Sequence, residues 1–282
     1  GHGGILPKDK ISEEIAMIRG VRRDVDCVSP ASHSAFSNPI ELMQFIQQLR
    51  DLSQGKPVGF KLCIGQPWQF MSIVKAMLHT QIVPDFIVVD GSVGGTGAAP
   101  VELINHMGTP LREGLLFVHN TLIGAGLRDQ IKIGASGKII SAFDIASMLA
   151  MGADWCNSAR GFMFALGCIQ AHSCHTNQCP VGIATQDHDR QKALHVATKA
   201  ERVFHFHQNT LHALAEMLAS AGLCHPNQVK SHHLAQRVND REIKNYAQLH
   251  FWLKPNELLE PNLDQEDHFY ARMWRLADMN RF

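Results

Sequence analysis

Residues 130–158 read QIKIGASGKIISAFDIASMLAMGADWCNS, and this stretch decides the fold. Two runs of strand length stand at its ends, Gln130–Gly134 and Asp154–Ser158, and each is built around apolar residues. Between them, Ala142–Met151 has the length and the amphipathic pattern of a helix. A strand, a helix and a second strand in this order predict a parallel βαβ unit, so we expect an α/β fold.

The same alternation of strands and helices extends back along the chain to Asp26. Further strands are expected at Asp26–Ser29, Val58–Cys63 and Asp85–Asp90, and further helices at Pro39–Leu52, Pro67–Thr80 and Leu111–Gly126. Asn38 before Pro39 is a typical helix start, because asparagine caps the first turn and proline fits the first helical position. Ser141 and Asp144 have the spacing of a capping box. These signals predict helices that cover a parallel sheet.

We expect these units to belong to a (β/α)8 TIM barrel. Five strands cannot close such a barrel, and Gly1-His2-Gly3-Gly4 reads like a loop within a fold, so we expect the missing N-terminal strands to precede Gly1. An open sheet is the alternative. After Gln186 the strand signals stop, and Lys192–Gly222 has the apolar spacing of a helix. We therefore expect a barrel portion at residues 1–186 and a helical extension at residues 187–282.

Composition narrows the classes of partner. The 26 basic and 26 acidic residues balance, which gives no indication of nucleic acid or of a charged membrane surface. No apolar run approaches the roughly 20 residues that span a bilayer, and the first residues lack the order of a signal peptide. Seven unevenly placed cysteines do not make a disulfide framework, so a reducing, cytoplasmic compartment is expected. Small molecules and proteins are the expected partners.

Two glycine-containing loops follow the last two expected strands. The first carries Gly134, Ser136 and Gly137, and the second carries Ser158, Ala159 and Arg160. Each loop stands between a strand and a helix, where backbone N–H groups converge on a bound anion. A single loop of this kind is more often only a tight turn. A pair on adjacent strands is typical of the phosphate site of a barrel, so we interpret both as phosphate loops.

A glycine run, Asp90-Gly91-Ser92-Val93-Gly94-Gly95-Thr96-Gly97-Ala98-Ala99-Pro100, follows the strand that ends at Asp90. Its members Gly94, Gly95, Thr96 and Gly97 carry almost no side chain, so the backbone can approach a flat ring or a substrate closely. The alternative is a flexible surface loop. We interpret the run, with Asp90 at its start, as part of a cofactor site.

Lys61 is a cation within the otherwise apolar run Gly59-Phe60-Lys61-Leu62. A buried charge needs a partner, so Lys61 is expected to face an anionic ligand or the electron-rich edge of a reduced flavin. The alternative is a structural ion pair with a carboxylate such as that of Asp90. We nominate Lys61 as both a cofactor-binding and a catalytic residue.

The sharpest motif is Cys168-x5-Cys174-x4-Cys179-Pro180. Three closely spaced cysteines that end in Cys-Pro are typical of iron–sulfur sites, and three ligands suit a three-iron (3Fe-4S) cluster. A zinc site needs four ligands, and His172 or His175 is a candidate for the fourth. A chance group of core cysteines is the remaining alternative.

At these residues the chain resembles the FMN-binding synthase domain of glutamate synthase and the stand-alone glutamate-synthase-like flavoproteins. The resemblance covers roughly Gly1 to Gln186 and rests on Cys168 to Gly182, Gly94 to Pro100, Lys61 and Ser136-Gly137. It implies a (β/α)8 barrel that binds FMN at its C-terminal face beside a 3Fe-4S cluster. It also implies reduction of 2-iminoglutarate, formed from 2-oxoglutarate and ammonia, to glutamate, with electrons from a donor protein or reductase.

Three departures separate this chain from the family pattern. His2 stands where the family has a glutamate, Val93 stands where a polar residue often precedes the Gly-Gly pair, and Asn157-Ser158-Ala159-Arg160 replaces a more glycine-rich turn. These changes leave the FMN and cluster motifs intact but weaken the assignment to 2-oxoglutarate. Two alternatives therefore stay open: another FMN-dependent reaction, namely N-methylglutamate formation or 2-hydroxy-acid oxidation, or a non-catalytic zinc-bearing barrel that docks a partner protein.

Overall fold

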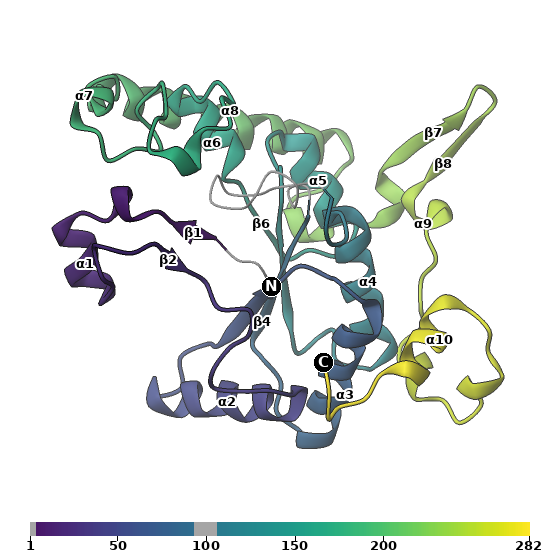
Figure 1. Cartoon of the computed structure of the whole chain (residues 1–282). Helices are drawn as coiled ribbons and strands as arrows, with labels where there is room; N and C mark the ends of the chain where they lie inside the picture. The colour runs from purple at the N-terminus through teal and green to yellow at the C-terminus, as the bar shows by residue number, and fades with distance from the viewer. Residues whose placement is uncertain (1–3, 93–105) are drawn as a thin grey trace.

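A computed structural model describes residues 4–92 and 106–282 of the chain. Its centre is a parallel four-stranded sheet in the order β3-β4-β5-β6 (Figure 1). The four strands are β3 (Gly59–Leu62), β4 (Phe86–Asp90), β5 (Lys132–Ser136) and β6 (Trp155–Asn157). The expected α/β fold with a parallel sheet is therefore confirmed, and closure into a complete barrel stays a prediction.

Helices alternate with these strands as the sequence predicts. They are α2 (Pro39–Leu52), α3 (Pro67–Thr80), α4 (Leu111–Gly124), α5 (Ala142–Ala150) and α6 (Arg160–Leu166). Both predicted caps are present: the Asn38 side chain accepts a hydrogen bond from the N–H of Glu41 at 2.9 Å, and Ser141 and Asp144 cap each other reciprocally. These local signals place α2 and α5 to within one residue of their predicted ends.

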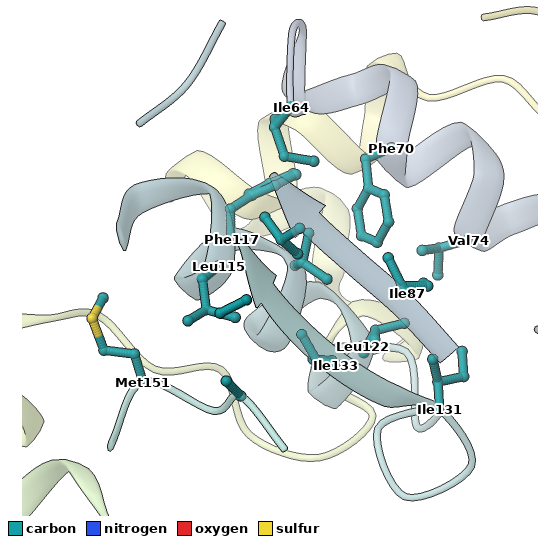
Figure 2. Close-up of a cluster of buried hydrophobic side chains, with 14 of the residues drawn as sticks. Ile64, Phe70, Val74, Ile87, Leu115, Phe117, Leu122, Ile131, Ile133 and Met151 are labelled. Atoms are coloured by element: carbon teal, nitrogen blue, oxygen red, sulfur yellow. The ribbon is translucent and has the colours of Figure 1, made fainter. Parts of the chain in front are cut away.

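The hydrophobic core lies between the sheet and the helices α3 and α4 (Figure 2). Ile87 of β4 and Ile133 of β5 are fully buried, and Phe70, Leu115 and Leu122 from the helices pack in the same cluster. The two central strands β4 and β5 each have three consecutive buried residues, as strands in the middle of a parallel sheet do. This rigid layer fixes the positions of the residues at the strand ends.

Two aspartates, Asp85 and Asp154, make equivalent hydrogen bonds between neighbouring strands at the N-terminal edge of the sheet. Asp85 accepts a hydrogen bond from the N–H of Val58 at 2.7 Å, and Asp154 accepts one from the N–H of Ile133 at 2.7 Å. Burial raises the pKa of Asp85, but hydrogen bonds from Val58 and Arg50 outweigh it and hold the pKa below its usual value. Neighbouring strands are thus locked in register at this edge.

One expected strand is wrong in its placement. Residues Asp26–Ser29 were expected in the parallel sheet, but β2 (Cys27–Val28) instead pairs antiparallel with β1 (Ile5–Leu6). Val28 is 57% exposed, so the segment does not have the burial that a central parallel strand requires. The short helix α1 (Glu13–Arg19) lies between β1 and β2, and Figure 1 shows this unit beside the main body.

The segment after Gln186 is helical at first and then irregular. It contains α7 (His188–Gln191), α8 (Val196–Ser220), β7 (Ala235–Asn239), β8 (Glu242–Asn245), α9 (Tyr246–Leu249) and α10 (Phe269–Leu276). Short 3-10 turns occur at Lys8–Lys10, Cys174–Thr176, Pro226–Gln228, Ser231–His233, Glu257–Leu259 and Leu263–Gln265. None of the helices in the described part of the chain is long and apolar enough to cross a membrane.

The hairpin of β7 and β8 corrects the expectation that strands end before Gln186. Every residue of β7 is exposed, so the hairpin has no alternation of apolar and polar residues from which to predict it. The C-terminal segment also shares the main core: the Asn120 side chain of α4 donates hydrogen bonds to the Tyr270 hydroxyl and the Phe251 carbonyl, both at 2.8 Å. The domain boundary at Gln186 stays a prediction.

Candidate functional site

Polar residues gather where the parallel strands end. Asp90 of β4 pairs in register with Ser136 of β5, and Ser136 pairs with Asn157 of β6. The carboxyl ends of these strands therefore lie at one edge of the sheet, which is where open and closed α/β folds bind their ligands. Most of the sequence-predicted cofactor residues within the described ranges stand at this edge or in the turns that follow it.

Lys61 forms an ion pair with Asp90, with 2.7 Å between Nζ and Oδ2. The ion pair with Asp90 is the alternative interpretation of Lys61, and this ion pair is present in the structure. The Lys61 side chain is 54% exposed, so it is not the buried cation that the apolar run suggested. The Lys61 ammonium group is accessible to solvent, and the Asp90 carboxylate beside it holds the ammonium in position. An exposed, oriented cation at the ligand edge of the sheet is suited to bind an anionic group.

The two predicted phosphate loops lie side by side. The N–H of Gly91 donates to the Ser136 carbonyl at 2.8 Å, and the Ser158 hydroxyl donates to the Ile139 carbonyl at 2.7 Å. The first bond ties the end of β4 to the end of β5, and the second ties the loop after β6 to the loop after β5. The adjacency that distinguishes a phosphate site from two unrelated turns is therefore present.

Gly137 is the residue that this arrangement requires to be glycine. Its φ of +141° lies in a region that other residues rarely adopt, and a Cβ here would approach the Gly91 nitrogen to 3.2 Å. Gly134 is constrained differently, because a Cβ would lie 2.5 Å from the Trp155 ring. The end of β5 and the turn that follows it are therefore closely packed, Gly134 against the Trp155 ring and Gly137 against the backbone of Gly91.

The second loop differs slightly from its prediction. Ser158 and Ala159 precede α6, but Arg160 is the first residue of that helix and not a loop residue. Gly161 follows, and a Cβ at this position would lie 2.7 Å from the Phe206 ring of α8. The C-terminal helix α8 thus packs directly behind the second loop and holds it in place.

The glycine run is outside the described residues at its most informative positions, Gly94, Gly95, Thr96 and Gly97. Of the run, only Asp90, Gly91 and Ser92 are described. The N–H of Ser92 donates to the Thr109 carbonyl at 3.1 Å, and the N–H of Thr109 donates to the Ile64 carbonyl at 2.8 Å. The start of the run is therefore anchored at the ligand edge of the sheet.

The cysteine motif forms an irregular loop that begins where α6 ends. Gly167 has a φ of +103°, and Gln170, His172 and Asn177 also have positive φ values. These left-handed residues bend the loop repeatedly. The N–H of Gln170 donates to the Cys168 sulfur at 3.5 Å.

Cys179 has the most distinctive surroundings of the three cysteines. Burial raises the pKa of its thiol, but hydrogen bonds from the backbone N–H groups that follow it outweigh burial, so the pKa is lowered. These donors belong to Ala184, Val181, Ile183 and Gly182. A sulfur that accepts several backbone hydrogen bonds is stabilised as a thiolate, which is the form that binds iron or zinc. The surroundings of Cys179 fit a metal-bound sulfur.

The three sulfurs are not arranged as a closed ligand set. Within residues 4–92 and 106–282 there is no group of three or more His, Cys, Asp or Glu side chains placed to hold a metal ion. Cys168, Cys174 and Cys179 share one loop, and all three are free cysteines. A 3Fe-4S cluster bound by these cysteines therefore stays a prediction.

A cavity of about 400 Å³ lies between the cysteine loop and the N-terminal segment. Lys10 closes one side, since its Nζ donates to the carbonyls of Cys174 at 2.8 Å and Ala184 at 3.2 Å. Arg19, the last residue of α1, also lines the cavity, and it has no hydrogen bond or ion pair with any residue in the described part of the chain. Sequence analysis missed both cations, because no motif marks them.

The family of the chain follows from comparison with known proteins. Residues 1–224 match the conserved region in glutamate synthase. This chain belongs to the glutamate synthase family. The glutamate synthase large subunit-like protein YerD of Bacillus subtilis (strain 168) is 43% identical over 247 residues, which cover 88% of this chain and 47% of that protein. The archaeal glutamate synthase (NADPH) of Methanocaldococcus jannaschii is 34% identical over 224 residues, which cover 79% of this chain and 43% of that protein.

The chain therefore spans less than half of the length of either family member. Among solved structures, a mutant flavocytochrome b2 with pyruvate bound is similar at a TM-score of 0.42 and 12% identity. That match covers 78% of this chain and 42% of the other. Membership of the glutamate synthase family agrees with the resemblance carried by the cysteine motif, the glycine run and Lys61.

Proposed function

We propose that this chain is the FMN- and iron–sulfur-binding part of an oxidoreductase that reduces an imino acid to an amino acid. The observation that carries the proposal is the adjacency of two phosphate-type loops beside the Lys61–Asp90 pair, in a chain of the glutamate synthase family. The substrate proposed is 2-iminoglutarate, formed from 2-oxoglutarate and ammonia with loss of water. Addition of a hydride to its imine carbon and a proton to its nitrogen yields glutamate.

The residues at the ligand edge have distinct proposed roles toward FMN. Residues 134–137 and 158–160 hold its phosphate, and Gly94 to Gly97 shape the substrate side. Bound FMN supplies the hydride, and Lys61 places a positive charge that favours the reduced, anionic flavin. Asp90 orients this lysine through their ion pair. Because the Lys61 ammonium is held but exposed, it is available to a ligand without a change in the fold.

The cysteine loop is proposed to hold a 3Fe-4S cluster through Cys168, Cys174 and Cys179. Such a cluster accepts electrons one at a time, so we expect a donor protein or a reductase as the partner. The backbone donors around Cys179 support this assignment, since they stabilise a sulfur that carries negative charge. We place both cofactors within residues 1–186, with residues 187–282 as an extension, in a cytoplasmic protein.

The cavity beside the cysteine loop is the proposed site of the substrate carboxylates. Arg19 and Lys10 line it, and Arg19 has no partner within the described residues, so its guanidinium is available for bidentate binding of a carboxylate. Lys10 already donates to two carbonyls and has a positioning role. One carboxylate of a dicarboxylic acid such as 2-oxoglutarate would pair with the Arg19 guanidinium.

The cofactor assignment is tested by anaerobic purification with measurement of the visible spectrum, flavin and iron. We expect about one FMN and about three iron atoms per chain, because three thiolates suit a three-iron cluster. Replacing Cys179→Ala should remove the iron and leave the flavin, since the two sites use different residues. Cys224→Ala is the matched control, because Cys224 is exposed and outside the motif.

In a separate variant, Lys61→Met should make the flavin reduction potential more negative with unchanged iron content, because the positive charge that favours the reduced flavin is removed.

A colourless preparation without flavin would contradict the proposal. Zinc at one atom per chain, without iron or flavin, would instead support the alternative of a non-catalytic barrel that docks a partner protein. Loss of flavin in the Cys179→Ala protein to the same extent as iron would show that the two sites cannot be assigned separately.

The substrate is tested by following reoxidation of the dithionite-reduced protein. We expect 2-oxoglutarate with ammonia to reoxidise the flavin, and Arg19→Gln to raise the concentration needed by roughly tenfold to a hundredfold through loss of a charge-assisted pair. Met17→Gln, on the exposed surface of the same helix, is the control. Reoxidation with methylamine but not ammonia would indicate N-methylglutamate formation. If neither amine works with 2-oxoglutarate, the glutamate assignment is wrong and the flavin assignment is unaffected.

A further inference from the structure

A second cavity lies at the opposite end of the parallel sheet from Lys61 and Asp90. Its volume is about 490 Å³, and its lining includes Lys132 at the start of β5 and Asp154 just before β6. The other side is formed by the C-terminal segment, which contributes Lys230 and Trp252. The cavity therefore lies between the N-terminal edge of the sheet and the residues that follow α8, and it is open to solvent on one side.

One side of this cavity is formed by Arg128, whose guanidinium already makes several hydrogen bonds within the protein. Arg128 donates to the Ile131 carbonyl at 3.0 Å, to the Gly152 carbonyl at 2.8 Å and to Asp154 at 2.9 Å. Its Nε donates to Nδ1 of His119 at 3.0 Å. The Arg128 guanidinium is thus committed to the protein, and the Asp154 carboxylate is neutralised by it. Neither group is left to repel or attract a ligand strongly.

His119 is a neutral part of the same wall. Since Nδ1 accepts a hydrogen bond from Arg128, the ring proton resides on Nε2. A Cβ on Gly152 would lie 2.2 Å from this ring, and the Trp252 ring stands edge-on to it at 5.9 Å. The histidine ring is therefore held between glycine and tryptophan and adds no charge to the cavity near neutral pH.

The lining also includes two lysines, two polar residues (Asn227 and Ser231) and the indole of Trp252. Lys132 is 65% exposed and lies 3.6 Å from Asp154, while Lys230 is exposed and makes no ion pair within the described residues. The Trp252 Nε1–H is buried and has no hydrogen-bond partner in the described part of the chain. An unsatisfied buried donor costs roughly 1–3 kcal/mol.

The charges around the cavity favour an anion. Arg128, Lys132 and Lys230 carry three positive charges, and Asp129 and Asp154 carry two negative charges, so the lining has a net charge of +1. Lys132 shares Asp154 with Arg128, so Lys230 carries the charge that is not paired within the described residues. Their ammonium groups and the indole N–H are all donors, and the volume exceeds that of a few water molecules.

We propose that this cavity binds a small metabolite that bears a phosphate or carboxylate group. Lys132 and Lys230 bind the anionic group, and the Trp252 ring, which lines the same cavity, packs against the remainder of the molecule. The site is separate from the proposed flavin and substrate sites, because it lies at the other end of the strands. Its occupation therefore does not depend on the proposed redox function.

The test uses the full chain and the NMR signals of its four indole N–H groups. Inorganic phosphate and succinate are titrated separately at constant ionic strength, with chloride as the reference anion. One indole signal should shift saturably, and that signal should be missing in Trp252→Phe. Lys230→Gln and Lys132→Gln should each weaken binding by about tenfold, the equivalent of about 1.4 kcal/mol. Lys192→Gln should bind normally, because Lys192 is exposed and paired with Asp189 elsewhere.

A response to phosphate alone identifies a phosphorylated ligand class, and a response to succinate alone identifies a carboxylate class. The proposal is overturned if neither anion gives a saturable shift, or if chloride gives the same shift. It is also overturned if Lys230→Gln and Lys192→Gln bind equally well. Because both lysines are exposed, their substitution is not expected to disturb folding.

Discussion

Replacement of Gly59→Ala is expected to lower the free energy of unfolding by about 3 kcal/mol or more. A Cβ at this position would lie 2.2 Å from the Phe86 carbonyl oxygen and 2.5 Å from the Phe86 ring. Because Gly59 and Phe86 are paired residues of β3 and β4, the clash is with backbone and cannot be relieved by a side-chain rotation. The two strands would have to separate, which would also disturb the Lys61–Asp90 pair. Denaturant unfolding at neutral pH measures the loss.

Gly65→Ala is the matched control for this substitution. Gly65 follows β3, and the nearest atom to a new Cβ would be the Gln69 side-chain oxygen at 3.7 Å, an ordinary contact. We expect a change within about 1 kcal/mol, mainly from the conformational entropy of the unfolded chain. Equal stability losses in the two variants would mean that the close approach of β3 to β4 at Gly59 is not required.

Acidification is expected to destabilise the fold through His119, by about 3 kcal/mol between pH 6.5 and about pH 4. Burial, with the positive charge of Arg128, lowers the pKa of His119 from 6.5 to about 4. The folded chain therefore binds a proton on this ring less readily than the unfolded chain does. Its contribution to stability is complete above pH 6.5 and is lost as the pH falls through the folded pKa. Unfolding free energies measured across this range give the slope.

His119→Asn removes the titration while keeping an acceptor for Arg128. We expect this variant to be less stable at neutral pH but to lose much less stability on acidification. His250→Asn is the comparison, since burial and then Arg112 lower the pKa of His250 as well. If wild-type and His119→Asn proteins show the same pH dependence, His119 is not the group that limits acid stability.

The sequence predicts the central helices and strands because their signals are local. Asn38 and Ser141 cap helices by accepting hydrogen bonds from residues three positions later. The continuous apolar runs of β4 and β5 predict that these strands are buried, and they are. The same holds for the loops after β5 and β6, whose adjacency follows from strand order once a parallel sheet is assumed. Local patterns fail where burial is absent, as in the exposed hairpin of β7 and β8.

By itself, the sequence determined the alternating α/β architecture, the two loops after the last parallel strands and the resemblance carried by the cysteine motif. Only the tertiary structure decided that Lys61 pairs with Asp90, that Cys27–Val28 pairs with Ile5–Leu6, and that Arg19 faces a cavity. The physical reason is the range of the interactions. Periodicity and capping report what a residue meets within a few positions, whereas ion pairs, strand partners and cavities join segments that only folding brings together.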